Sequence, residues 1–203
     1  MFPRLFIFLF FFCGYVQAQT FHKVVIFQHD GTQIDGLAKL PAFMSDSKTI
    51  SFKMDNSSKT QKMKSNDIKT ICYYLRDKKI LEIEYIRYLS FFDVSNNWQN
   101  VSAPEWIEVL VRGDMMLYVI KETSRNGQRK STIYHYFVKR ENEEFATEIA
   151  YVRYKGDFLI YRMEAGDYFA NTPEIERKIT RREEGYSAKD IVNIVNEYNS
   201  LKK

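Results

Sequence analysis

Alternating apolar and polar residues dominate the chain between Trp106 and Lys139, and they predict three consecutive antiparallel strands. The first of these strands ends at Gly113-Asp114, a pair that favours a turn. The second and third strands are apolar on both faces, which is unusual for a sheet with one face in water. We therefore expect other elements, the C-terminal helices and the N-terminal strands, to cover the second face.

The residues on either side of this stretch predict further strands. Asp30-Gly31 lies between two apolar runs, which is a strong signal for a β-hairpin. The additional predicted strands are 23–28, 33–40, 48–54, 59–64, 68–75, 80–89 and 145–152. In the long strand that precedes the central three, we expect Leu81 to face the core and Glu82 and Glu84 to face solvent.

Helical signals follow in the C-terminal part. Thr172 is a favourable N-cap with Pro173 at the first helical position, and Ser187 with Asp190 resembles a capping box. Residues 157–169 fit a helix or a strand, and we predict a helix because their apolar residues share one helical face. The chain therefore predicts an α+β fold, in which an antiparallel β region, open or barrel-like, is followed by two or three C-terminal helices that pack on it.

Residues 1–18 have the composition of a secretory signal peptide. Arg4 supplies a positive charge, Leu5 to Phe12 form a short apolar run, and Ala18 is a small residue at the expected cleavage position. The run is shorter than the roughly 20 residues that a membrane-crossing helix needs. We expect a mature chain 19–203 that is exported to the periplasm or the exterior, with association with the outer membrane as a further alternative.

Charge and cysteine content narrow the class of protein. The net charge is +4 with both signs interspersed, which indicates a solvated surface rather than a groove for a polyanion. Removal of the signal peptide takes away Cys13 and leaves Cys72 alone, which excludes an intramolecular disulfide and a metal site built from several thiolates. We expect Cys72 to be a small buried residue. The mature chain is expected to form one β-rich domain, with a subdivision into 19–90 and 91–203 as the alternative.

Both ends of the mature chain carry a pattern of turn and helix-face residues. The positions are Asp30-Gly31, Ile34-Asp35-Gly36, Ile50-Ser51-Phe52, Asp67-Ile68-Lys69, Tyr168-Phe169, Pro173-Glu174-Ile175, Asp190-Ile191-Val192 and Glu197-Tyr198-Asn199. At these positions the chain resembles uncharacterised exported proteins of Gram-negative bacteria. The resemblance implies an exported compartment and a β-then-α architecture, and it brings no catalytic residue.

Few residues stand out as candidates for chemistry. For His135, in a predicted strand, we favour a core or interface imidazole with a satisfied hydrogen bond, and the alternative is a general base or a ligand. The alternative would need an acidic neighbour, and the candidates are Glu82, Glu84 and Glu108. Trp98 lies in a loop rich in Asn and Gln, where it either presents an aromatic face to a sugar or peptide or packs on the sheet.

Motifs for other functions are missing from the sequence. We find no closely spaced histidines, no glycine-rich phosphate loop and no nucleophile elbow, and we expect neither a metal nor a cofactor. Glutamates balance the basic residues of the C-terminal helices, which disfavours nucleic acid. We therefore expect a non-catalytic binding or structural module of the bacterial cell envelope, with an envelope protein or glycan as partner. The alternative is a hydrolase or transferase that acts on an envelope glycan or peptide.

Overall fold

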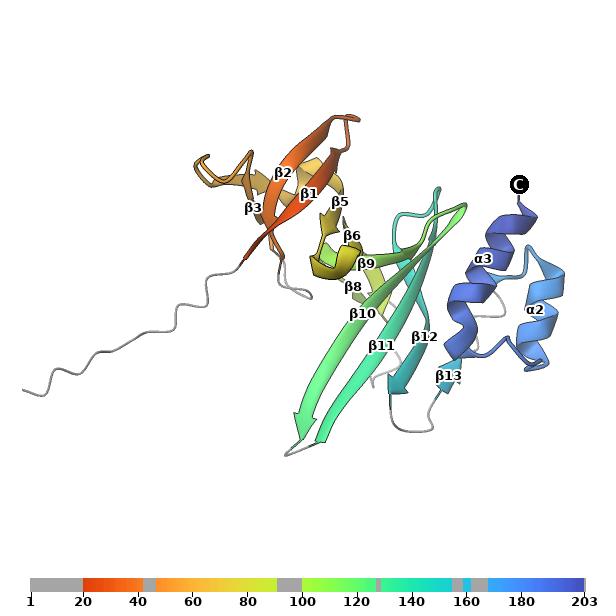
Figure 1. The fold of residues 1–203 in the computed structure, drawn as a ribbon. Helices are drawn as coiled ribbons and strands as arrows, with labels where there is room; N and C mark the ends of the chain where they lie inside the picture. Colours follow the sequence, from red (N-terminus) through yellow and green to blue (C-terminus); the bar gives the residue numbers. More distant parts are fainter. Residues whose placement is uncertain are drawn as a thin grey trace, which may run out of the picture.

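The computed structural model of the chain is one long, mostly antiparallel sheet with two helices at its C-terminal side (Figure 1). It describes residues 20–41, 47–90, 100–126, 129–154, 159–161 and 168–202. The predicted signal peptide 1–18 and the loop residue Trp98 lie outside these ranges. Among the described residues, no helix combines the length and the apolar character that crossing a membrane requires.

The elements follow the predicted order of strands and then helices. The strands are β1 (Phe21–Gln28), β2 (Gln33–Lys39), β3 (Thr49–Lys53), β4 (Gln61–Lys64), β5 (Ile68–Tyr74), β6 (Ile80–Ile86), β7 (Tyr88–Ser90), β8 (Asn100–Val101), β9 (Glu105–Val111), β10 (Met115–Asn126), β11 (Arg129–Arg140), β12 (Ala146–Tyr154) and β13 (Leu159–Tyr161). The helices are α2 (Pro173–Thr180) and α3 (Ile191–Leu201). The 3-10 turns are η1 (Ser65–Asp67), η2 (Arg76–Lys78) and η3 (Ala188–Asp190).

The hydrogen-bonded order of the sheet is β4-β3-β2-β1-β5-β6-β9-β10-β11-β12-β7-β8, and β13 also pairs with β12. β6 and β9 are therefore neighbours, and one continuous sheet joins the N-terminal and C-terminal halves of the chain. The path ends at β4 and β8 without closing. The structure confirms the β-then-α prediction and shows an open sheet.

The predicted strand 80–89 is divided at Arg87. β6 pairs antiparallel with β9, whereas β7 pairs in parallel with β12 through Tyr88 and Leu89. The segment β6–β7 therefore pairs with both outer strands of the group β9, β10, β11 and β12. The ring of Tyr88 packs on Phe137 with 4.8 Å between the ring centroids, so this segment also covers one face of the strands it connects.

The helix predicted for 157–169 is wrong at Leu159–Tyr161, which form β13. These residues pair antiparallel with Ala150 to Val152 of β12. A short apolar segment has no strong local preference, and here the available edge of β12 decides in favour of a strand. Residues 157, 158 and 162–167 of that prediction lie outside the described ranges.

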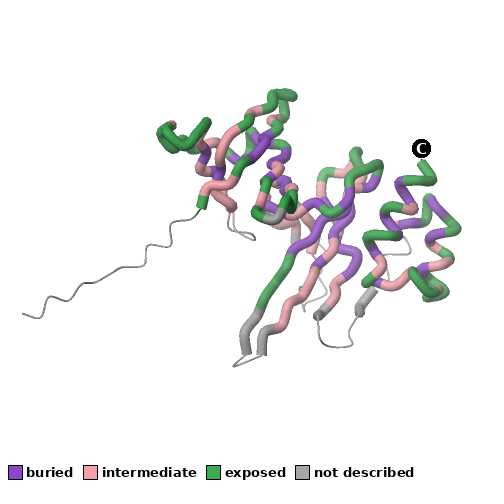
Figure 2. The backbone as a smooth tube through the Cα atoms, in the orientation of Figure 1, coloured by how far each residue is buried: buried purple, intermediate pink, exposed green. Residues whose placement is uncertain are grey.

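Within the described ranges, the buried apolar side chains form three hydrophobic cores on the faces of the sheet. Figure 2 shows where the buried residues lie along the backbone. The N-terminal core lies among β1 to β6 and includes Trp106 of β9. The other two lie on opposite faces of β10, because Leu117 belongs to the core beneath the helices and Tyr118 to the core on the other face. The expectation that both faces of this strand are covered is confirmed.

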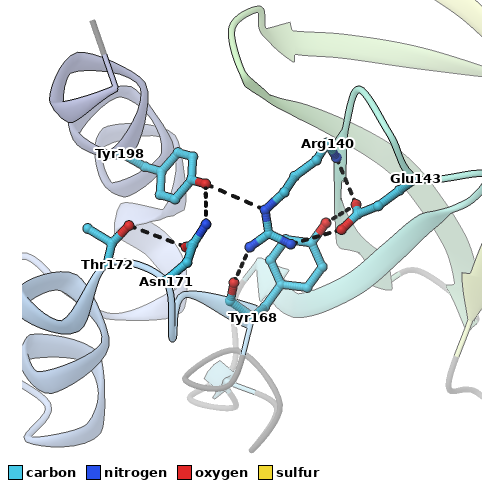
Figure 3. A network of polar contacts seen from close by, with 6 residues as sticks. All are labelled: Arg140, Glu143, Tyr168, Asn171, Thr172 and Tyr198. Atoms are coloured by element: carbon cyan, nitrogen blue, oxygen red, sulfur yellow. Dashed lines mark hydrogen bonds and ion pairs between the residues drawn. The ribbon is translucent and has the colours of Figure 1, made fainter.

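The helices are held on the sheet by a polar network around Arg140 at the end of β11 (Figure 3). Its guanidinium donates to Glu143 at 2.8 Å, to the carbonyl oxygen of Tyr168, and to the hydroxyl of Tyr198 at 3.5 Å. Asn171 also donates to that hydroxyl, at 2.9 Å. Burial and the hydrogen bond to Glu143 raise the pKa of the Tyr168 phenol. The network therefore joins α3, the segment before α2 and the turn after β11.

A second contact joins α3 to the start of β10, where the pairing with β9 has not yet begun. The amide of Asn199 in α3 accepts a hydrogen bond from Met115 N at 2.8 Å and donates to Met115 O at 2.9 Å. A Cβ atom on Gly113 would come within 2.4 Å of the Asn199 side chain, so glycine allows α3 to approach this closely. Both backbone groups of Met115 depend on a side chain that is distant in the sequence.

We predict that Asn199→Ala lowers the free energy of unfolding by roughly 2–4 kcal/mol, because it leaves two buried backbone groups without partners. The matched control is Asn196→Ala, an exposed position on the same helix, which should change stability by less than about 0.5 kcal/mol. Urea denaturation of both variants measures the difference. Equal stability of the two variants would contradict the role of Asn199.

Candidate functional site

His135 lies in β11 and contacts carboxylates on both neighbouring strands. Its Nδ1 is 2.9 Å from Oε1 of Glu148 in β12, and its Nε2 is 3.6 Å from Oε2 of Glu122 in β10. The Glu148 side chain is fully buried, whereas that of Glu122 is 50% exposed. Glu122 lies two positions from Ile120, the register partner of His135 in β10, and Glu148 is the register partner of Phe137, two positions from His135, so both carboxylates lie diagonally from His135 on the same face of the sheet. His135 is a buried imidazole with a hydrogen-bond partner, as in the favoured sequence interpretation.

Glu108, one of the acidic candidates from the sequence, does not lie beside His135. Glu108 pairs in register with Val119, and His135 pairs with the next residue, Ile120, so the two side chains lie on opposite faces of the sheet. Glu108 forms an ion pair with Lys121. Glu108 is therefore not the acidic neighbour of His135, and Glu148 lies beside the imidazole instead.

Trp98 itself is outside the described residues, but the ends of its loop are described. β7 and β8 flank the loop, and Ser90 pairs with Asn100 where the two strands meet. The hydroxyl of Ser90 donates to Oε2 of Glu148 at 3.3 Å. The loop that carries Trp98 thus begins beside the His135–Glu148 pair.

Glu84 is the clearest departure from the predicted orientations. It was expected to face solvent, yet it is only 7% exposed. Tyr118 donates to its Oε2 at 2.7 Å, and Arg112 and Thr70 donate to its Oε1 at 2.8 Å and 3.0 Å. Alternation alone predicted exposure, but this face of β6 is covered as well, because Glu84 faces Ile107 and binds Tyr118, and both of these residues belong to a hydrophobic core. These charge-assisted hydrogen bonds make the burial of the carboxylate tolerable.

Arg112, the residue after β9, forms an ion pair with this buried carboxylate and also lines an open cavity. Arg112 also binds Glu82. Burial lowers the pKa of the guanidinium, but the hydrogen bonds and charges of Glu82 and Glu84 raise it by more, so the pKa lies above its ordinary value. The adjoining cavity has a volume of about 440 Å³. Its lining comprises Phe27, Gln28, His29, Gly31, Lys69, Thr70, Cys72, Glu82 and Arg112.

The thiol of Cys72 borders this cavity and is half-buried instead of fully buried. Burial raises its pKa, Glu82 raises it further, and Arg112 opposes the shift. The thiol is therefore protonated at neutral pH, and a protonated thiol is a weak nucleophile. Cys72 and Glu82 are direct register partners on β5 and β6, so the register of two adjacent predicted strands could have revealed their proximity.

A second cavity of about 240 Å³ lies between β9 and β10. It is lined by Leu75, Lys79, Leu81, Trp106, Glu108, Val119, Ile120 and Lys121. Trp106, Glu108 and Val119 lie on the sheet face opposite to Glu84. The two cavities therefore open on different faces. In the described ranges, no three His, Cys, Asp or Glu side chains are grouped to hold a metal ion.

No family model matches the chain, and the searches of curated proteins and of solved structures gave no match either. The functional interpretation of these sites therefore rests on their own geometry and chemistry.

We predict that Cys72, the only cysteine of residues 19–203, reacts slowly with iodoacetamide at neutral pH. The rate should increase by about tenfold per pH unit between pH 7 and 9, because the thiolate reacts and the pKa lies above the ordinary value of 9.0. Glu82→Gln removes a negative charge that raises this pKa, so its alkylation should be faster at each pH. Glu108→Gln, on the opposite face, is the control and should leave the rate unchanged.

We predict that His135→Ala lowers the free energy of unfolding by roughly 3 kcal/mol, because it leaves the buried carboxylate of Glu148 without its imidazole partner. Glu122→Gln should cost less than about 0.5 kcal/mol, since that side chain is half-exposed. Thermal and urea denaturation report both values. A small effect of His135→Ala would show that Glu148 is stabilised by other contacts.

Proposed function

We propose that the protein is an exported, non-catalytic binding module of the bacterial cell envelope, and that the cavity beside Arg112 is its ligand site. The observation that carries this proposal is that a preformed cavity is lined by two charged groups already fixed as a pair, Arg112 and Glu82, and that Arg112 is also paired with the buried Glu84. Such preorganisation favours recognition, because little ordering remains to be done when a ligand arrives.

The same groups are poorly suited to proton transfer. A general acid or base needs a pKa near the working pH, whereas the pKa of Arg112 is raised above its ordinary value. The thiol of Cys72 has a raised pKa as well and is a weak nucleophile. The cavity therefore offers hydrogen bonds and charge without a group poised for reaction.

The lining suits a ligand that has both donors and acceptors. Lys69 is exposed at the cavity, Arg112 is 43% exposed, and Glu82 supplies an acceptor. Phe27, 37% exposed, adds an apolar surface. Peptides and glycans combine these features, and both are abundant in a bacterial envelope. The signal-peptide pattern at 1–18 and the resemblance to exported proteins support this compartment.

The test is isothermal titration of mature protein with purified peptidoglycan fragments, both stem peptides and glycan oligomers. We expect binding that weakens by about tenfold in Lys69→Ala, the loss of one charge-assisted hydrogen bond, and also in Phe27→Ala. Both positions are exposed, so neither variant disturbs the buried cluster. Lys62→Ala, exposed on β4 away from the cavity, is the control. Absence of binding to every fragment, or equal affinities of all variants, would refute this assignment.

A second candidate function, hydrolysis or group transfer on an envelope glycan or peptide, is favoured by one observation. The Nδ1 of His135 is bound to a buried carboxylate, an arrangement that orients imidazoles in general-base sites. Under this alternative, His135→Gln would abolish turnover of peptidoglycan fragments while Lys69→Ala would not. Chromatography of the incubated fragments distinguishes turnover from binding.

A further inference from the structure

The strands β9 and β10 pair over a short distance and then separate. Their register covers only Leu117 to Val119 of β10, opposite Val111 to Glu108 of β9. Beyond this point β9 continues beside β6, and the β10–β11 hairpin extends past it (Figure 1). Within the described part of the chain, β10 from Ile120 to Asn126 has no strand partner on the side of β9.

The second cavity lies where the two strands separate, and we call it the β9–β10 notch. Its apolar lining comes from Leu75, Leu81, Trp106, Val119 and Ile120. Its volume is about 240 Å³, and a cavity of about 150 Å³ holds a benzene molecule, so the notch accommodates one large apolar side chain. It thus combines an apolar pocket with an adjacent strand edge.

The charge around the notch is positive. Lys121 is neutralised by Glu108, and three exposed basic residues follow the lining residue Leu75: Arg76 and Lys78 in the turn η2, which also contains Asp77, and Lys79, which lines the notch itself. Among the described side chains, none forms an ion pair with these three basic residues. The turn is fixed, because Leu75 N donates to Lys79 O at 2.9 Å and Lys78 adopts a left-handed φ of 59°.

We propose that the β9–β10 notch is a docking site for an extended acidic segment of another protein. The segment adds as a strand to the edge of β10, places one apolar side chain in the notch, and directs its carboxylates at the turn η2. Main-chain hydrogen bonds to a sheet edge provide affinity in this mode of recognition, and a side-chain pocket provides specificity. A lipid surface would meet the positive charge, but it would leave the main-chain groups of the edge without partners.

This site is separate from the cavity beside Arg112, so the two proposals fail independently. The probe is a fluorescent ten-residue peptide of alternating threonine and leucine with two aspartates at one end. Its binding to mature protein is followed by fluorescence anisotropy. The first comparison peptide carries lysines in place of the aspartates, and the second is N-methylated at alternate residues, which removes half of its backbone donors.

We expect saturable binding of the aspartate peptide, with affinity at least about tenfold weaker for each comparison peptide. The double variant Lys78→Glu with Lys79→Glu should weaken binding by more than about tenfold, whereas Lys69→Glu, at the other cavity, should not. Both lysines are exposed, so the folded sheet is preserved, and circular dichroism verifies this.

Three outcomes would overturn the proposal. Equal binding of the N-methylated peptide would show that the edge of β10 takes no part. Binding to vesicles of one-quarter phosphatidylglycerol in phosphatidylcholine, without binding of the peptide, would identify a membrane surface. A dimer in light scattering that the double variant dissociates would identify a second copy of the chain as the occupant.

Discussion

The burial of β10 and β11 on both faces is the constraint on which the rest of the structure depends. Each Å² of apolar surface left in water costs about 25 cal/mol of folding free energy. A strand that is apolar on both faces therefore needs another element packed on each face. α3 provides one cover through Leu117, and the β6–β7 segment provides the other by bending toward Phe137. The curvature that results also encloses polar groups. Glu84 and Glu148 are buried for this reason, and each has its own partner, Arg112 and His135.

The sequence was informative wherever the signal was local. Alternation located the strands, Asp30-Gly31 predicted the first hairpin, and Ser187 with Asp190 forms the predicted capping box before α3. The failures share a cause, because each depended on distant residues. The segment 159–161 became a strand at the edge of β12, and the segment 80–90 is divided between two partners. Alternation predicted the second and third central strands only for 115–120 and 131–139. Their polar ends, 121–126 and 129–130, were missed because they pair with each other without an apolar face to mark them.

The candidate sites were less predictable than the fold for the same reason. Glu84 was expected in solvent because a polar residue in an alternating strand normally faces water, but here both faces are covered. The pairing of His135 with Glu148 depends on a register that shifts between Tyr136 and Phe137, and no local pattern indicates such a bulge. The cavity beside Arg112 unites residues of β1, β5 and β6 with the turn after β1 and the residue after β9, and only the facing pair of Cys72 and Glu82 could have been deduced from adjacent strands.

The division of the segment 80–90 has a consequence for the order of folding. β6 can pair early with its hairpin neighbour β5, but β7 has to wait for β12, and Ser90 and Glu148 are 58 positions apart. Closing so long a loop costs entropy before any contact compensates for it, and topologies rich in such contacts fold slowly. Until that closure, the apolar face of β10 opposite α3 stays open to water and to other chains. The rate of this single step therefore sets how long the nascent protein is vulnerable to aggregation.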